Sequence, residues 1–235
     1  MENLTNSQKS IWVTEQYYKG SSVNTISGSS IIDEKLDFQK LEKSIRIVCQ
    51  KHDNFKTKLK IKEDNIRQTF EEPLNSEIQM IKVDSKEELE KRREEIVRKP
   101  FDVNQHLFKF YIFKFSNDYG AFMLNIHHLI SDAWTLALIC NEIIKTYSAI
   151  KQNKEVETKA IYSYIDYINS EKEYQQSEKY QKDKKYWLEK YQTIPEVARI
   201  PGSKHESDKI TNIIGERTQF SVKKEEINKI KEYCK

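Results

Sequence analysis

The chain has 235 residues, of which 37% are hydrophobic and 33% are charged, so it is long enough to fold around a sizeable core. Its 40 lysine and arginine residues nearly balance 37 aspartate and glutamate residues, and the lysines are interleaved with glutamates. The small net charge of +3 argues against a nucleic-acid partner, whose recognition requires clustered basic residues.

Cysteine usage and the N-terminal residues indicate the compartment. Cys49, Cys140 and Cys234 form an odd set without a CxxC pair, which favours a reducing interior over a disulfide framework or a zinc site. The opening MENLTNSQ is polar and lacks the apolar core of a signal peptide. The longest apolar runs are too short to span a bilayer. We therefore expect a cytoplasmic protein outside the membrane.

The first third of the chain predicts a strand, a helix and a hairpin. Residues 23–32 are rich in β-branched side chains and predict a strand. Asp37 is placed to cap a helix. Residues 57–62 and 66–70 predict a hairpin. The helix is expected to bury a stripe at helical spacing, made of Phe38, Leu41, Ile45, Val48, Cys49 and His52.

A short strand and a polar helix follow. Residues 78–83 predict the strand. Ser85 and Glu88 form a capping-box pattern at the start of a helix that stops at Pro100. This helix is so polar that we expect it on the surface.

The most apolar part of the chain lies in its middle. Residues 107–115 and 121–127 predict two strands at the centre of a sheet, and residues 133–150 predict a buried helix. A long helical region fills 159–192. The stripe expected on the helix of 133–150 is Leu136, Ile139, Cys140, Ile143, Tyr147 and Ile150.

The pattern changes after residue 193. A short strand is expected at 216–222, followed by the start of a helix at 223–234. The alternation of strands and helices along the whole chain favours an α/β or α+β fold with a mixed sheet.

The stretch NIHHLISDAW, residues 125–134, is the most informative for function. Because consecutive side chains of a strand point to opposite faces, His127 and His128 are not expected to serve one site together, which disfavours a metal. Two interpretations remain. In the first, hydrogen bonds satisfy both imidazoles and Asp132 caps a helix. In the second, one imidazole lies beside a carboxylate and a helix N-terminus and transfers protons near neutral pH.

Several motifs in order along the chain resemble a known family. HHLISDAW resembles the HHxxxDG motif of nonribosomal peptide synthetase condensation domains, which the chloramphenicol-acetyltransferase-like acyltransferases share. LTNSQKSIWVTEQ (4–16) is similar to the family's first motif, QKHDNFKTKL (50–59) to its second and YIDY (164–167) to its fourth. The resemblance covers essentially the whole chain and about the first half of the family's domain.

The resemblance implies a fold and a division of the chain. We expect one lobe of the chloramphenicol-acetyltransferase-like fold, an α/β (α+β) two-layer sandwich with a mixed sheet flanked by helices. Residues 1–192 would be the N-terminal lobe, and 193–235 a crossover segment with the start of the second lobe. The rest of that lobe is expected beyond Lys235, so the chain alone should have little or no condensation activity.

The resemblance also implies an activity and partners. The family forms amide bonds between acyl and aminoacyl thioesters that carrier proteins hold on phosphopantetheine arms, without a metal or a tightly bound cofactor. Expected partners are carrier proteins, the rest of a synthetase chain and a second copy of this chain in a homodimer. Two alternatives stay open: a related HHxxxD acyltransferase using a coenzyme A or carrier thioester, and a non-catalytic module that docks carrier proteins.

Roles for individual residues follow from the same resemblance. His128 would be the catalytic base or the group that orients the nucleophile. His127 and Trp134 would be structural. Asp132 would be structural too, paired with a basic residue of the second motif, where Lys51 and Lys56 stand.

Other motif positions are expected to support the lobe. Ala133 replaces the family's glycine, and we expect it to be the first residue of the helix, where alanine costs nothing. Gln8 and Trp12 share a helix face and are expected in the core. Tyr164 and Asp166 are expected to brace the lobe.

Overall fold

The computed structural model describes residues 1–62, 65–72, 77–159, 162–196 and 220–234. The chain divides into a compact unit of Met1–Thr193 and a second unit of Ile194–Lys235. The described helices include none with the length and apolar composition of a bilayer-spanning segment.

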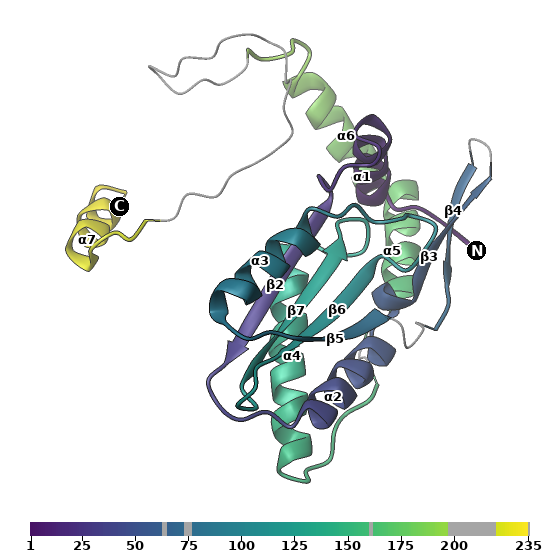
Figure 1. The fold of residues 1–235 in the computed structure, drawn as a ribbon. Helices are drawn as coiled ribbons and strands as arrows, with labels where there is room; N and C mark the ends of the chain where they lie inside the picture. Colours follow the sequence, from purple (N-terminus) through teal and green to yellow (C-terminus); the bar gives the residue numbers. More distant parts are fainter. Residues whose placement is uncertain (63–64, 73–76, 160–161, 197–219, 235) are drawn as a thin grey trace. The chain divides into compact units, whose positions relative to one another are not determined.

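The larger unit alternates strands and helices (Figure 1). Its elements in chain order are β1 (Glu2–Asn3), α1 (Asn6–Tyr17), β2 (Thr25–Ile32), α2 (Phe38–Lys51), the 3₁₀ helix η1 (Asp53–Lys56), β3 (Thr57–Lys62), β4 (Asn65–Phe70), β5 (Ile78–Lys82), α3 (Lys86–Val97), β6 (Phe108–Lys114), β7 (Gly120–His127), α4 (Ala133–Lys151), α5 (Tyr164–Gln176) and α6 (Glu178–Lys190).

The main sheet is mixed, as the sequence predicts. Its strand order is β2-β7-β6-β5, with β2 and β6 antiparallel to β7 and β5 parallel to β6. The two most apolar strands, β6 and β7, are the central ones, which confirms their expected place. A smaller antiparallel sheet, β1-β4-β3, contains the predicted hairpin.

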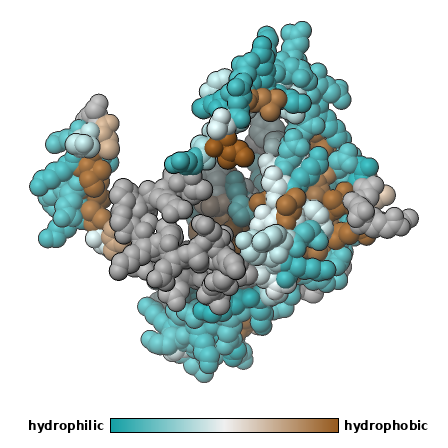
Figure 2. Space-filling model, turned by 90° about the horizontal axis from the view of Figure 1, so that it is seen from above, coloured by the Kyte–Doolittle hydropathy of each residue, from teal (hydrophilic) through white to brown (hydrophobic). Residues whose placement is uncertain are grey.

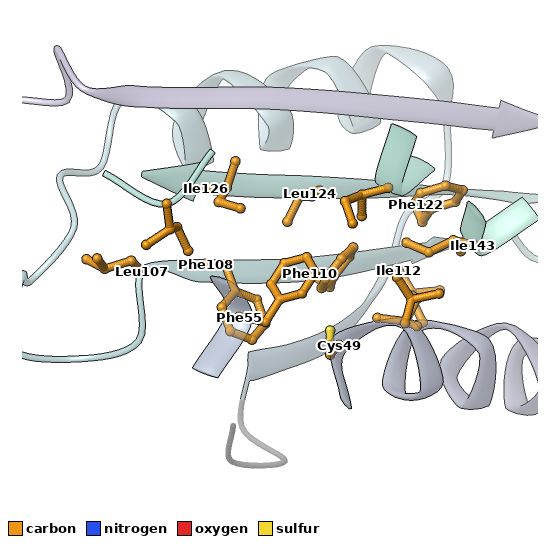
Figure 3. Packing of buried hydrophobic residues seen from close by; sticks show 14 of the residues in the cluster. Cys49, Phe55, Leu107, Phe108, Phe110, Ile112, Phe122, Leu124, Ile126 and Ile143 are labelled. Carbon is orange, nitrogen blue, oxygen red and sulfur yellow. The ribbon is translucent and has the colours of Figure 1, made fainter. Parts of the chain in front are cut away.

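Helices cover both faces of the main sheet. Figure 1 shows α3 in front of the sheet and α4 behind it. Alternate residues of β6 and β7, such as Phe110 and Leu124, pack with α2 and α4 (Figure 3). Their neighbours, such as Tyr111 and Met123, pack with α3. Two apolar clusters therefore form on the two sides of one sheet, the larger beneath α2 and α4.

Capping groups fix where several helices begin. The Asp37 carboxylate accepts the Lys40 backbone N–H and starts α2, as predicted. The Ser85 hydroxyl accepts the Glu88 N–H and starts α3, but Glu88 accepts from Asp84 instead of completing the box with Ser85. Polar as it is, α3 still buries Leu89 and Ile96.

The prediction that the helix of 133–150 is buried is wrong for one side of the helix. α4 buries Ile139, Ile143 and Tyr147, but Trp134 is 74% exposed and Leu138 is 53% exposed. Leu136, Cys140 and Ile150, expected in the stripe, are only partly buried. The helix packs against α2 and one face of the sheet, and a helix with neighbours on one side buries one stripe.

Two other predictions need correction. The helical region expected at 159–192 is two helices, because Ser177 leaves the helical conformation and its hydroxyl accepts the Tyr180 N–H to start α6. His52 is not part of the α2 stripe, since it lies just after the last helical residue and is half-buried.

Gly120 has no room for a side chain. A Cβ there would collide with the backbone carbonyl oxygen of Phe113 on the paired strand and lie 3.0 Å from the Phe38 ring. Gly120→Ala should therefore lower the free energy of unfolding, measured by urea denaturation, by about 1–3 kcal/mol. In the matched variant Gly28→Ala, the added Cβ meets only the flexible end of Leu136, which can rotate, so the loss should be smaller. Equal losses would contradict this explanation.

The second unit contains α7 (Lys224–Tyr233), which confirms the helix expected at 223–234. Ile227 and Ile230 form an exposed apolar stripe on this helix, which Figure 2 shows in brown on an otherwise mostly hydrophilic helix. Of the strand predicted at 216–222, residues 216–219 lie outside the described residues, and 220–222 have no strand conformation.

Candidate active site

The turn after β7 carries the histidine pair. His127 is the last residue of β7, His128 is the first residue of the turn, and α4 begins at Ala133. The Asn24 carbonyl accepts the His128 N–H at 2.7 Å, and the His127 carbonyl accepts the Ile130 N–H at 3.1 Å. The backbone of the turn is thus tied to the start of β2 and to itself.

Two side chains hold the carbonyl groups of the same turn. Gln8 Nε2 donates to the Leu129 carbonyl at 3.1 Å, and Asn54 Nδ2 donates to the Ile130 carbonyl at 3.2 Å. Gln8 is buried, as the core interpretation of its helix face predicts, but it acts through hydrogen bonds, including one from the Thr5 N–H at 3.0 Å. Trp12, expected in the core, is only partly buried and packs against the larger apolar cluster.

His127 is occupied at both ring nitrogens and is only 2% exposed. Its Nδ1 accepts the Leu129 N–H at 3.1 Å, so the proton of the neutral ring is on Nε2, which donates to Glu15 Oε2 at 3.2 Å. Burial lowers the pKa of His127, against the opposing effect of the Glu15 carboxylate. The arrangement suits a neutral, structural imidazole.

His128 has a different environment. The residue is half-buried, and none of the described residues forms a hydrogen bond with its ring. It lies near Asp132, since its charge is among the influences that lower the Asp132 pKa, after the larger contribution of the Thr135 N–H. The ring nitrogens of His128 therefore have no hydrogen-bond partner among the described residues, whereas both ring nitrogens of His127 have one.

Asp132 and Ala133 start α4. Asp132 Oδ1 accepts the Thr135 N–H at 2.7 Å, and Ala133 is the first helical residue. Ala133 is not among the residues with positive φ, so alanine fits there without strain, as predicted. The expected ion pair of Asp132 is wrong: within the described ranges, no lysine or arginine lies at ion-pair distance from this carboxylate.

The lysines of the second motif have other partners. Lys51 Nζ lies 2.7 Å from Glu142 Oε1, and His52 Nε2 lies 2.6 Å from Glu142 Oε2, so one α4 carboxylate holds the end of α2. Lys56 pairs with Glu72 at 2.9 Å. Sequence reasoning missed Glu142, because only the packing of α2 on α4 places it opposite Lys51.

Glu142 should make stability depend on pH. Burial raises the pKa of Glu142, but the hydrogen bonds from Lys51 and His52 outweigh burial and hold it below its ordinary 4.5. The carboxylate therefore stabilises the fold above pH 4.5, and this contribution is lost as pH falls through the lowered pKa. Glu142→Gln should lower the free energy of unfolding at pH 7 by about 1–2 kcal/mol.

Urea denaturation at a series of pH values measures this effect. The difference between Glu142→Gln and the unmodified chain should shrink below pH 4.5. Glu94→Gln, at an exposed position of α3, is the matched control and should leave stability unchanged at pH 7. A Glu142 difference that is the same at every pH would contradict the ion-pair explanation.

Residues at the start of α5 contact β4 and the second-motif residue Asp53. Tyr164 stacks on Tyr167 with 5.7 Å between ring centroids and meets the edge of Phe70 at 6.4 Å. Asp166 Oδ2 accepts the Ser163 N–H, and the Ser163 hydroxyl donates to Asp53 at 2.6 Å. These contacts agree with the bracing role expected of Tyr164 and Asp166.

The described residues include free cysteines but no cluster of metal-ligating side chains. In the described part of the chain, no three His, Cys, Asp or Glu side chains gather as they would around a metal ion. Cys49, Cys140 and Cys234 are free thiols, the first of them buried.

The comparisons with known proteins agree on one family. The family model described as "Condensation domain" matches residues 1–235. Surfactin synthase subunit 1 of Bacillus subtilis (strain 168) is 25% identical over 213 residues, covering 84% of this chain and 6% of that protein. Bacitracin synthase 3 of Bacillus licheniformis is 22% identical over 233 residues, covering 99% of this chain and 4% of that protein.

Solved structures share the fold. The starter condensation domain of the rhizomide synthetase RzmA superposes with a TM-score of 0.74 at 22% identity, covering 80% of this chain and 47% of that chain. The first condensation domain of the calcium-dependent antibiotic synthetase gives 0.72 at 17% identity, covering 83% and 49%. This chain therefore spans about half of the solved domains and a small fraction of the synthetases.

Proposed function

The chain belongs to the condensation-domain family, and on that premise we propose that its larger unit is the N-terminal lobe of a domain that forms amide bonds in nonribosomal peptide synthesis. The observation that carries the proposal is the pair of environments at 127 and 128. Side chains of α1 and η1 hold the turn, where His127 is buried with both ring nitrogens hydrogen-bonded. His128 is half-buried close to the N-terminus of α4, and none of the described residues hydrogen-bonds to its ring nitrogens.

In the proposed reaction, two thioesters react at His128. The amine of an aminoacyl thioester attacks the carbonyl carbon of a donor acyl thioester, a C–N bond forms and the C–S bond breaks. The amine proton leaves, and the released thiol takes up a proton. His128 would accept the amine proton or orient the amine, since either role needs a free ring nitrogen within hydrogen-bond reach.

The start of α4 would assist the same step. Backbone N–H groups at a helix N-terminus stabilise negative charge, so the N–H of Ala133 is a candidate donor to the developing oxyanion. Because Ala133 is the first helical residue and does not have a positive φ, its replacement of the family's glycine does not count against this role.

Substrates and partners follow from the same proposal. A RzmA condensation domain was crystallised with C8-CoA and Leu-SNAC, an acyl and an aminoacyl thioester. We propose that this chain uses corresponding thioesters on the phosphopantetheine arms of carrier proteins, in the cytoplasm, with no tightly bound cofactor. Its partners would be carrier proteins and the remainder of a synthetase. A homodimer would use the exposed face of α4, where Trp134 and Leu138 lie.

An assay with two forms of the protein tests the function. The 235-residue chain and a form extended by a complete second lobe are each mixed with acyl- and aminoacyl-loaded carrier proteins, and amide product is followed by mass spectrometry. We expect product from the extended form and little or none from the chain alone, because the solved domains are about twice as long as the matched residues. No product from the extended form with any loaded pair would contradict the proposal.

A further inference from the structure

A buried carboxylate lies behind the histidine pair. Glu15, near the end of α1, is 6% exposed, and its Oε2 accepts two hydrogen bonds. Asn24 Nδ2 donates at 2.7 Å and His127 Nε2 donates at 3.2 Å. Both partners are themselves buried, so two polar side chains meet at one carboxylate oxygen within the fold.

Each partner of Glu15 also holds a backbone N–H next to the His128 side chain. The carbonyl of Asn24 accepts the N–H of His128 itself at 2.7 Å. The Nδ1 of His127 accepts the N–H of Leu129 at 3.1 Å. The peptide groups before and after the His128 Cα are therefore fixed by two residues that share the Glu15 carboxylate.

The negative charge of Glu15 selects the tautomer of His127. A carboxylate only accepts hydrogen bonds, so it favours the imidazole that carries its proton on Nε2. That tautomer alone leaves Nδ1 free to accept the Leu129 N–H. An amide in place of the carboxylate could donate or accept, and would no longer impose one tautomer.

The two hydrogen bonds that Glu15 accepts offset the cost of its burial. Burying a carboxylate is costly unless it is well hydrogen-bonded, and among the described residues no lysine or arginine forms an ion pair with Glu15. An apolar side chain would fill the space without that cost, but it could hold neither Asn24 nor His127.

We propose that Glu15 is a positioning residue that orients His128 through Asn24 and His127. The effect of Glu15 on catalysis rests on the proposed function, but its effect on the orientation of His128 does not depend on that function. Loss of the carboxylate should loosen both peptide groups that flank His128 and leave the sheet beneath them intact.

The test uses NMR of the 235-residue chain, with hydrogen exchange at single amides and the ¹⁵N shifts of the His127 ring. In Glu15→Gln, the amides of His128 and Leu129 should exchange about tenfold faster, while amides of β6 keep their protection. The His127 ring should change from the Nε2–H form to a mixture of tautomers. Glu94→Gln, an exposed change of the same kind, should alter none of these readouts.

A second variant distinguishes the contact of Glu15 with Asn24 from its contact with His127. Asn24→Ala removes only the amide that joins Asn24 to Glu15, so faster exchange should be confined to His128, with the His127 tautomer kept. This variant also tests the proposal if Glu15→Gln does not fold. Unchanged exchange at both amides in folded Glu15→Gln, or equal acceleration across β6 in Asn24→Ala, would overturn it.

Turnover gives an independent readout. In the two-lobe form, Glu15→Gln should lower kcat about tenfold with KM unchanged, since a misaligned imidazole affects the chemical step more than binding. A kcat equal to that of Glu94→Gln would overturn the positioning role. An inactive two-lobe form would contradict the proposed function alone, because the NMR measurements need no turnover.

Discussion

His128→Ala in the two-lobe form is expected to lower kcat for amide formation by about 10²–10⁴-fold, the contribution usual for a positioned acid–base group. The physical reason is the difference between the environments of His127 and His128 at the end of β7. None of the described residues hydrogen-bonds to the His128 ring, so removal of the ring should leave the hydrogen bonds of the turn in place. The reaction should slow because the group proposed to accept the amine proton or orient the amine is lost.

Controls for this variant separate chemistry from folding. Urea denaturation of His128→Ala should give a free energy of unfolding close to that of the unmodified protein, and KM for both carrier-bound substrates should change little. His127→Ala is the comparison at the adjacent residue. It should destabilise the fold, because it leaves Glu15 and the Leu129 N–H without their partner. Full turnover by His128→Ala would refute its catalytic role.

Phe110→Ala is expected to lower the free energy of unfolding by about 3–5 kcal/mol, a large part of the stability of a typical domain. Phe110 is fully buried on β6, where its ring lies 5.9 Å from Phe55 and 6.1 Å from Phe108 (Figure 3). Removal of the ring leaves a cavity between the sheet and η1, on the side of the sheet that α2 and α4 cover.

Equilibrium urea denaturation of the chain measures this loss. Phe220→Ala is the matched control, since it removes the same ring from a residue that is 81% exposed. We expect no measurable change from it. A loss below about 1 kcal/mol for Phe110→Ala would show that the core collapses around the gap and would contradict a rigidly packed cluster.

Local signals predicted most of the fold. The period of Leu41, Ile45 and Val48 gave α2, and the cap at Asp37 gave its first residue, because both depend on neighbours in sequence. The exposed side of α4 was not predictable in this way. The predicted stripe leaves out Trp134 and Leu138, which are indeed exposed, but the apolar composition of residues 133–150 wrongly predicted that the helix as a whole is buried.

The site was predictable only where it forms a contiguous motif. HHLISDAW predicted the start of α4, which the structure confirms, and singled out His128 and His127 as candidates. Glu15 and Glu142 were missed, because each meets its partner across a long stretch of chain. Their positions depend on the register of β2 against β7 and on the packing of α2 against α4. An unremarkable glutamate in a sequence rich in glutamate carries no local mark of such a role.

The pairing of β2 with β7 has a consequence for biosynthesis. Thr25 of β2 pairs with His127 of β7. β5 pairs with its parallel partner β6, which is synthesised only after the whole of α3. Such distant pairings slow folding, because the loops between them must close before any contact forms. During translation, β2, which begins one residue after Asn24, is the first strand of the main sheet to emerge, and it stays unpaired. The nascent chain should therefore expose an aggregation-prone edge until residue 127 has left the ribosome, and a chaperone that shields this strand should raise the yield of folded protein.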